Sequence, residues 1–135
     1  MLVDLIKAGF GEDQDYNCAE KILHGANQVY GLNLPKQTLK CAGGFGGGMA
    51  IEDKCGVLTA AIMVLGCLFI KDRAHESSRI KDLTRELFAR FEKEMGSINC
   101  APLKEKYRTP ELNCRLVILK GAEILDSIVK RELSK

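Results

Sequence analysis

The sequence predicts an all-α protein, and three features of the chain lead to this prediction. The sixteen residues from Cys55 to Ile70 carry no charge, which is typical of a buried central helix. Apolar residues recur at helical spacing on both sides of this run, and no segment alternates as a half-buried strand does. We therefore expect one domain over residues 1–135, a compact bundle of about four main helices with short additional helices.

The N-terminal part predicts a short helix and then a longer one. Leu2 to Ala8 form the short apolar segment, and an acidic loop follows it. Asn17, with Glu20 three residues later, is close to a capping box, so Cys18 takes the first position of the next helix. Gly31 is a typical stop signal for that helix.

The central part contains a proline, a run of glycines and the uncharged segment. Pro35 is well placed to open a short helix that reaches about to Cys41. The loop from Gly43 to Gly48 has few side chains, and Asp53 after it resembles an N-cap. This cap would place Cys55 in the first turn of the central helix.

The C-terminal part predicts two long helices with a short one between them. Ser77–Ser78 begin the first, which has an apolar stripe and a charged outer face and ends at Gly96. Asn99 caps a short helix that starts at Cys100. The segment Thr109–Glu111 begins the last helix, on whose apolar face Cys114 lies.

Composition and charge exclude several classes of function. The chain is 46% hydrophobic and 28% charged, as ordinary globular proteins are, and its net charge of +2 is too small to favour nucleic acid or an anionic membrane. The N-terminal residues lack the pattern of a signal peptide, and no apolar run is long enough for a membrane span. We therefore expect a cytoplasmic protein with neither a nucleic-acid nor a membrane partner.

Four of the six cysteines are candidate functional residues because of where they fall. Cys18, Cys55 and Cys100 lie in the first turns of predicted helices, and Cys114 lies near another helix start. Free amides and the helix dipole favour negative charge there, which lowers the pKa of a thiol. Thiolates attack disulfides and bind soft metals, so the four cysteines predict a shared catalytic or metal-binding site.

The glycine loop is the second candidate feature. Its five glycines allow unusual backbone angles or the close approach of a cofactor. The candidate cofactor-binding glycines are Gly43, Gly44, Gly46, Gly47 and Gly48. The loop does not match the dinucleotide-binding fingerprint or the P-loop. We expect it to lie beside the four cysteines.

Common cysteine motifs are absent. No C-x-x-C occurs, so neither a thioredoxin-type dithiol nor a zinc ribbon is indicated, and no C-x-x-C-H occurs for covalent haem. The cysteines are spread singly over separate segments, so only the tertiary fold can bring them together.

The pattern resembles the redox-active protein family with the C…GCAxxG…C…C cysteine signature. The matching segments are NCAEKIL, GGFGGGMAIEDKCGVLTAAIMVLG, GSINC and LNCRLVILKGAEIL, in the family's order. The resemblance implies that Cys18, Cys55, Cys100 and Cys114 are the signature cysteines, with Cys41 and Cys67 as structural extras. Ala60 stands in place of the second glycine of the central motif, and Val57 stands where alanine is usual. The family is also similar to a module found with split-Soret cytochromes, although this chain has no haem attachment site.

Three functions remain open at this point. The four thiolates suit electron transfer through an iron–sulfur cluster, zinc or another soft metal. They equally suit thiol–disulfide chemistry with a redox partner protein or a small-molecule electron donor. The third function is a non-catalytic helical interaction module with buried cysteines. Because all three functions remain, the sequence does not decide whether the chain is an enzyme. Small residues in the central helix, Gly56, Ala60 and Gly66, further predict a homodimer.

Overall fold

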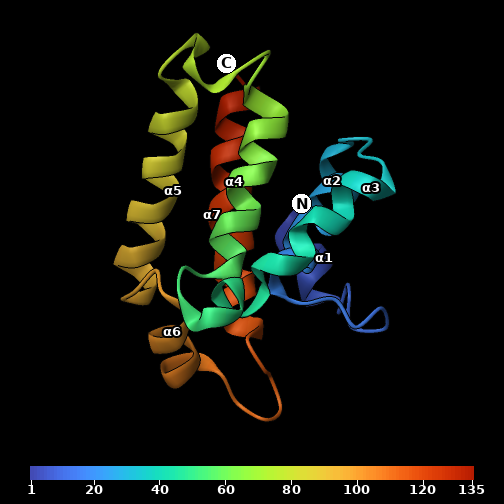
Figure 1. Cartoon of the computed structure of the whole chain (residues 1–135), viewed down its shortest axis with the longest axis vertical. Helices are drawn as coiled ribbons and strands as arrows, with labels where there is room; N and C mark the ends of the chain where they lie inside the picture. The colour runs from blue at the N-terminus through green and yellow to red at the C-terminus, as the bar shows by residue number, and fades with distance from the viewer.

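The computed structural model describes all 135 residues, and it confirms an all-helical chain without strands (Figure 1). The α-helices are α1 (Leu2–Lys7), α2 (Cys18–Tyr30), α3 (Lys36–Leu39), α4 (Gly56–Phe69), α5 (Arg79–Met95), α6 (Cys100–Tyr107) and α7 (Arg115–Leu133). The shorter helical turns are η1 (Lys40–Phe45), η2 (Gly48–Glu52) and η3 (Ala74–Glu76). Extended pairing is limited to two isolated bridges, Lys54 with Asn99 and Thr109 with Asn113.

Helix α4 is the centre of the bundle, as its uncharged sequence predicted. It packs against α2, α5 and α7, and Figure 1 shows it between these helices. Side chains such as Leu58, Val64 and Leu65 are fully buried, while Cys67 on the outer side is exposed. Helices α4 and α7 run in the same direction, so both begin at the end of the bundle where α6 lies (Figure 1).

Helix α1 is attached to α7 through one buried carboxylate. Asp126 accepts hydrogen bonds from the backbone amides of Leu2 at 2.9 Å and Val3 at 2.8 Å. The hydroxyl of Tyr30 donates to the same carboxylate at 2.5 Å. The first amides of a helix have no partner within it, so Asp126 satisfies groups that would otherwise be buried unpaired.

Several predicted helix ends are confirmed. Asn17 and Glu20 form the capping box at the start of α2 in both directions, each side chain accepting from the other's backbone amide at 3.0 Å. Gly31 and Gly96 end α2 and α5 in the left-handed conformation.

Two predicted helix starts are wrong. Asp53 does not cap α4, which begins three residues later with Cys55 as the preceding residue. Thr109–Glu111 does not begin α7. Instead, Thr109 and Asn113 exchange backbone hydrogen bonds of 3.3 and 2.7 Å that close a turn, and the helix starts at Arg115. In both places the chain forms backbone pairing outside the helix, and the helix begins later than the predicted cap.

The small residues of α4 serve packing within the chain. Gly56 and Ala60 are buried, and only Gly66 is partly exposed, so the first two do not offer a surface to a second copy. The homodimer therefore stays a prediction. None of the helices combines the length and apolar character needed to cross a lipid bilayer.

Candidate functional site

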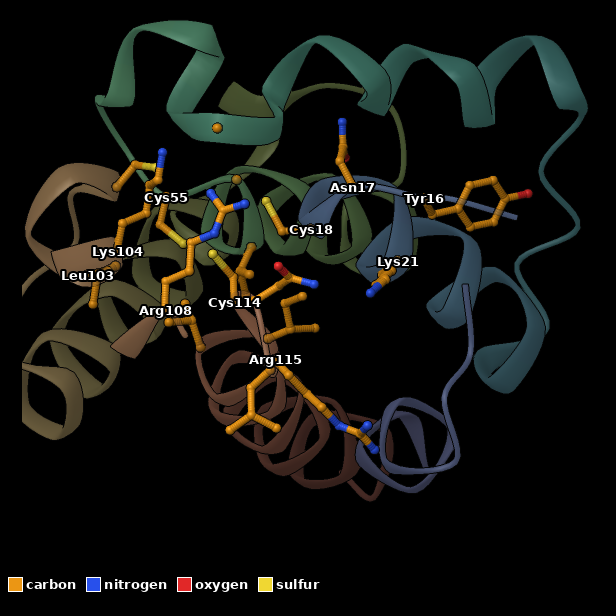
Figure 2. Close-up of a pocket in the computed structure, with 18 of the residues that line it drawn as sticks. Tyr16, Asn17, Cys18, Lys21, Cys55, Leu103, Lys104, Arg108, Cys114 and Arg115 are labelled. Atoms are coloured by element: carbon orange, nitrogen blue, oxygen red, sulfur yellow. The ribbon is translucent and has the colours of Figure 1, made fainter. Parts of the chain in front are cut away.

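The four predicted cysteines line a single cavity of about 340 Å³. Cys18 and Cys100 are the first residues of α2 and α6, whereas Cys55 and Cys114 immediately precede α4 and α7. Four helices thus begin at one place, and each contributes one thiol. Figure 2 shows Cys18, Cys55 and Cys114 directed into the same space.

The capping residue of α2 also fixes the glycine segment. Asn17 donates from Nδ2 to the carbonyl of Gly43 at 3.0 Å, in addition to its capping bond with the α2 amide. A Cβ atom at Gly46 would overlap the Asn17 side chain. The start of α2, with Cys18, therefore packs directly on the glycine segment.

Cys55 and Cys100 are held by a short extended pairing. The amide of Cys55 donates to Ile98 O at 2.9 Å, and the amide of Cys100 donates to Asp53 O at 2.6 Å. At the centre of this pairing, Lys54 donates from Nζ to Asn99 Oδ1 at 2.8 Å. This pairing explains why α4 begins after Cys55 rather than at the predicted cap.

The end of the glycine segment forms a left-handed turn beside the thiols. Gly47, Gly48, Met49 and Ala50 all have φ between 62° and 66°. This conformation costs a residue with a Cβ atom roughly 1–2 kcal/mol, so strain is concentrated next to the site. The unusual angles expected of this loop are present.

The glycines around the cavity leave room for the thiols. A Cβ atom at Gly48 would lie 2.6 Å from Cys100 Cβ, and one at Gly56 would lie 2.8 Å from Cys18 Sγ. Gly47 lines the cavity, and its amide stabilises the Cys18 thiolate. The other predicted glycines do not line the cavity: Gly43, Gly44, Gly46 and Gly48.

The expected lowering of the thiol pKa values is wrong for three cysteines. Burial raises the pKa of Cys55 to about 12, although the amides of Val57 and Leu58 oppose this shift. Burial likewise raises the pKa of Cys18 and of Cys100. The free-energy cost of removing a thiolate from water is larger here than the stabilisation that the helix starts provide.

Cys18 is electrostatically coupled to all three other thiols. The charge of Cys114 raises the pKa of Cys18, and the charge of Cys18 raises the pKa of both Cys55 and Cys100. These are secondary causes after burial. They show that Cys18 is a neighbour of each of the other three, and the same kind of cause makes Cys100 a neighbour of Cys18, Cys55 and Cys114.

The thiols are separate rather than gathered into a metal cage. All six cysteines are free, and no group of three or more His, Cys, Asp or Glu side chains could hold a metal ion. Four thiols are a suitable donor set for a soft metal, but their arrangement does not fit one. Cys41 and Cys67 are exposed and lie outside the cavity.

Basic residues of the cavity were missed by the sequence analysis. Lys21, Lys104, Arg108 and Arg115 line it together with the thiols. Each lies three or more residues from a signature cysteine except Arg115, which follows Cys114 directly. Isolated basic residues on helix surfaces carry no sequence signal of their own, so only the fold reveals them.

Comparison with known proteins supports the cysteine pattern. No curated protein and no solved structure matches the chain significantly. The sequence pattern of one family, described as "Putative redox-active protein (C_GCAxxG_C_C)", matches residues 16–128. That range holds all four cavity cysteines and the glycine segment. Because this range covers most of the chain, the chain belongs to this family.

Proposed function

We propose that this protein carries out reversible thiol–disulfide chemistry with the thiols of the cavity. The observation that carries the proposal is that four free thiols from four separate helices line one cavity, and they do so without forming a metal cage. The family's description as redox-active supports the same class of chemistry. A non-catalytic module has no need to bring four thiols to one cavity.

Cys18 and Cys114 are the pair best placed to react with a molecule in the cavity. Both are half-buried, whereas Cys55 and Cys100 are only 5% and 8% exposed. Cys18 and Cys114 are also electrostatic neighbours. Cys18 and Cys114, the outer pair, therefore have more exposed surface for a substrate than Cys55 and Cys100, the inner pair.

The inner pair is poorly placed to form a bond. Lys54 pairs with Asn99 in antiparallel fashion, so Cys55 lies opposite Ile98 and diagonal to Cys100. Diagonal residues of this kind have Cα atoms about 7–8 Å apart. Disulfides require a separation below about 7 Å, so a Cys55–Cys100 bond needs backbone movement.

The reaction proceeds through a mixed disulfide. The Cys18 thiolate, stabilised by the Gly47 amide, attacks one sulfur of a small disulfide and releases a thiolate that takes up a proton. The Cys114 thiolate then attacks Cys18 Sγ, which forms the Cys18–Cys114 bond and releases the second thiol. The protein loses two protons and two electrons, and the small disulfide gains both. The reverse reaction uses a dithiol donor or a redox partner protein.

Thiol mapping tests the proposal. Protein purified without oxygen is treated with a small disulfide, the remaining thiols are blocked, and peptides are analysed by mass spectrometry. We expect the loss of two thiols and a peptide that links Cys18 to Cys114. Cys18→Ser should prevent this linkage, and the matched control Cys67→Ser should preserve it because Cys67 lies outside the cavity.

Metal analysis of the same anaerobic sample separates the competing function. Iron or zinc at a stoichiometric level, lost in Cys18→Ser and retained in Cys67→Ser, would replace thiol–disulfide chemistry with a metal centre. An absence of any linkage after treatment with disulfide, in a sample that also holds no metal, would favour the non-catalytic module.

A further inference from the structure

The rim of the thiol cavity carries more positive than negative side chains. Four cations line it, and the carboxylates that line it are Glu12 and Asp15. Two of the cations are already paired, because Lys21 contacts Glu12 at 2.8 Å and Lys104 contacts Glu52 at 2.7 Å. The cavity therefore has charge that an anionic ligand could complement.

The two arginines differ in what they bind. Arg115 donates to the backbone carbonyl of Lys7 and so is used within the fold. Arg108, at the end of α6, makes no side-chain hydrogen bond or ion pair, although it lines the cavity. Figure 2 shows its side chain reaching toward the thiols. The planar guanidinium offers five N–H donors and matches a carboxylate in two-point contact.

The helix starts add to the positive character of this cavity. Helices α2, α4 and α7, of 13, 14 and 19 residues, all begin at its wall. The start of each helix carries a partial positive charge and amides without helical partners. Arg108 and these helix starts thus contribute positive charge to one cavity.

We propose that the cavity binds a small carboxylate-bearing thiol or disulfide, with its carboxylate on Arg108 and its sulfur at Cys18 and Cys114. This assignment of the substrate class rests on the thiol–disulfide function proposed above. A cavity of about 340 Å³ is of the size that holds small molecules rather than a protein segment. Arg108 fixes the anionic end, and the sulfur of the ligand is thereby placed next to the reacting pair.

Rates of oxidation with matched disulfides test the proposal. The reduced protein is mixed with dithiodipropionate, which carries two carboxylates, or with uncharged hydroxyethyl disulfide, and the loss of free thiols is followed in time. We expect Arg108→Gln to lower the ratio of the rate constant for the anionic disulfide to that for the neutral disulfide by about tenfold. A hydrogen bond to a charged group changes an equilibrium constant by about this factor. Arg108→Lys should retain part of the preference.

The control removes the same charge elsewhere. Arg85 is exposed on α5, makes no ion pair and does not line the cavity, so Arg85→Gln should leave the ratio unchanged. An equal drop of the ratio in Arg85→Gln would mean that only the overall charge of the protein matters. An unchanged ratio in Arg108→Gln would also overturn the proposal.

A binding measurement without sulfur exchange separates this proposal from the proposed function. Calorimetry with 3-(methylthio)propanoate and its uncharged methyl ester uses ligands that cannot form a disulfide. Arg108-dependent binding of the acid alone supports the anion site even if no disulfide oxidises the protein, in which case the proposed function fails. Oxidation by both disulfides with equal rates, and no preference for the acid, leaves the function standing and overturns the anion site.

Discussion

The contact between α4 and α7 gives a sharp test of the fold around the site. Gly121 of α7 faces Val57 of α4, and a Cβ atom at Gly121 would overlap Val57 Cγ1. Both helices carry a cavity cysteine just before their first residue, so their spacing positions Cys55 and Cys114. Gly121→Ala should force the two helices apart.

The size of the effect follows from two opposing contributions. Adding a methyl group to a filled core costs about 1–3 kcal/mol, whereas glycine to alanine within a helix returns about 1 kcal/mol. The overlap with Val57 places the cost toward the upper end of its range. We expect a net loss of about 1–2 kcal/mol in the free energy of unfolding, measured by urea denaturation with circular dichroism.

A second variant tests the same contact from the side of α4. Val57→Ala alone should cost about 2 kcal/mol, because it removes two buried methyl groups. In the double variant the nearest atoms to the new methyl group are Cβ of residue 57 at 3.5 Å and Phe91 Cε2 at 3.8 Å, which are ordinary contacts. The double variant should therefore be about 1–2 kcal/mol more stable than the sum of the two single changes predicts. Strict additivity, or a Gly121→Ala protein as stable as the parent, would show that Gly121 and Val57 do not pack closely against each other.

Three further changes have expected outcomes. Asp126→Asn weakens the attachment of α1 and should lower the free energy of unfolding by about 1.5–3 kcal/mol, with early hydrogen exchange at the start of α1, because the carboxylate accepts three hydrogen bonds, one from Tyr30. Burial raises the pKa of Cys55 to about 12, so above pH of about 8.5 the unfolded thiol ionises while the folded one stays neutral. Stability should fall as the pH rises through this window, and Cys55→Ala should reduce the slope by up to about 1.4 kcal/mol per pH unit in alkaline denaturation experiments. Pairing with cations, above all with Lys135, lowers the pKa of Glu132 to about 2. The Glu132 carboxylate therefore adds to the free energy of unfolding above pH of about 4.5, and this contribution is lost as the pH falls toward 2. Glu132→Gln should flatten acid denaturation in that range, and an unchanged curve would contradict the pairing.

Helix ends set by neighbouring residues could be predicted from the sequence. The capping box of Asn17 and Glu20 and the left-handed stops at Gly31 and Gly96 depend on backbone groups within a few residues, so local chemistry decides them. The central position of α4 followed from its lack of charge, since such a helix cannot face water on all sides.

Helix starts that depend on distant segments could not be predicted. Asp53 resembles a cap, but its carbonyl accepts from the amide of Cys100, which lies 47 residues further along the chain. The prediction that the thiol pKa values are lowered was wrong for a related reason. Position at a helix start is visible in the sequence, but burial under other helices is not, and burial is the larger cause at Cys18, Cys55 and Cys100.

Under the proposed thiol–disulfide chemistry, the arrangement of the four thiols also limits how many electrons the site can exchange. Cys18 and Cys100 each neighbour all three other thiols, so the first disulfide determines which pair is left. If that bond is Cys18–Cys114, the remaining thiols are the diagonal pair Cys55 and Cys100, whose pairing requires the extended segments to move. Those segments are joined by backbone hydrogen bonds of 2.9 and 2.6 Å, which resist such movement. We therefore expect the proposed thiol–disulfide chemistry to exchange two electrons per chain, with Cys55 and Cys100 kept reduced.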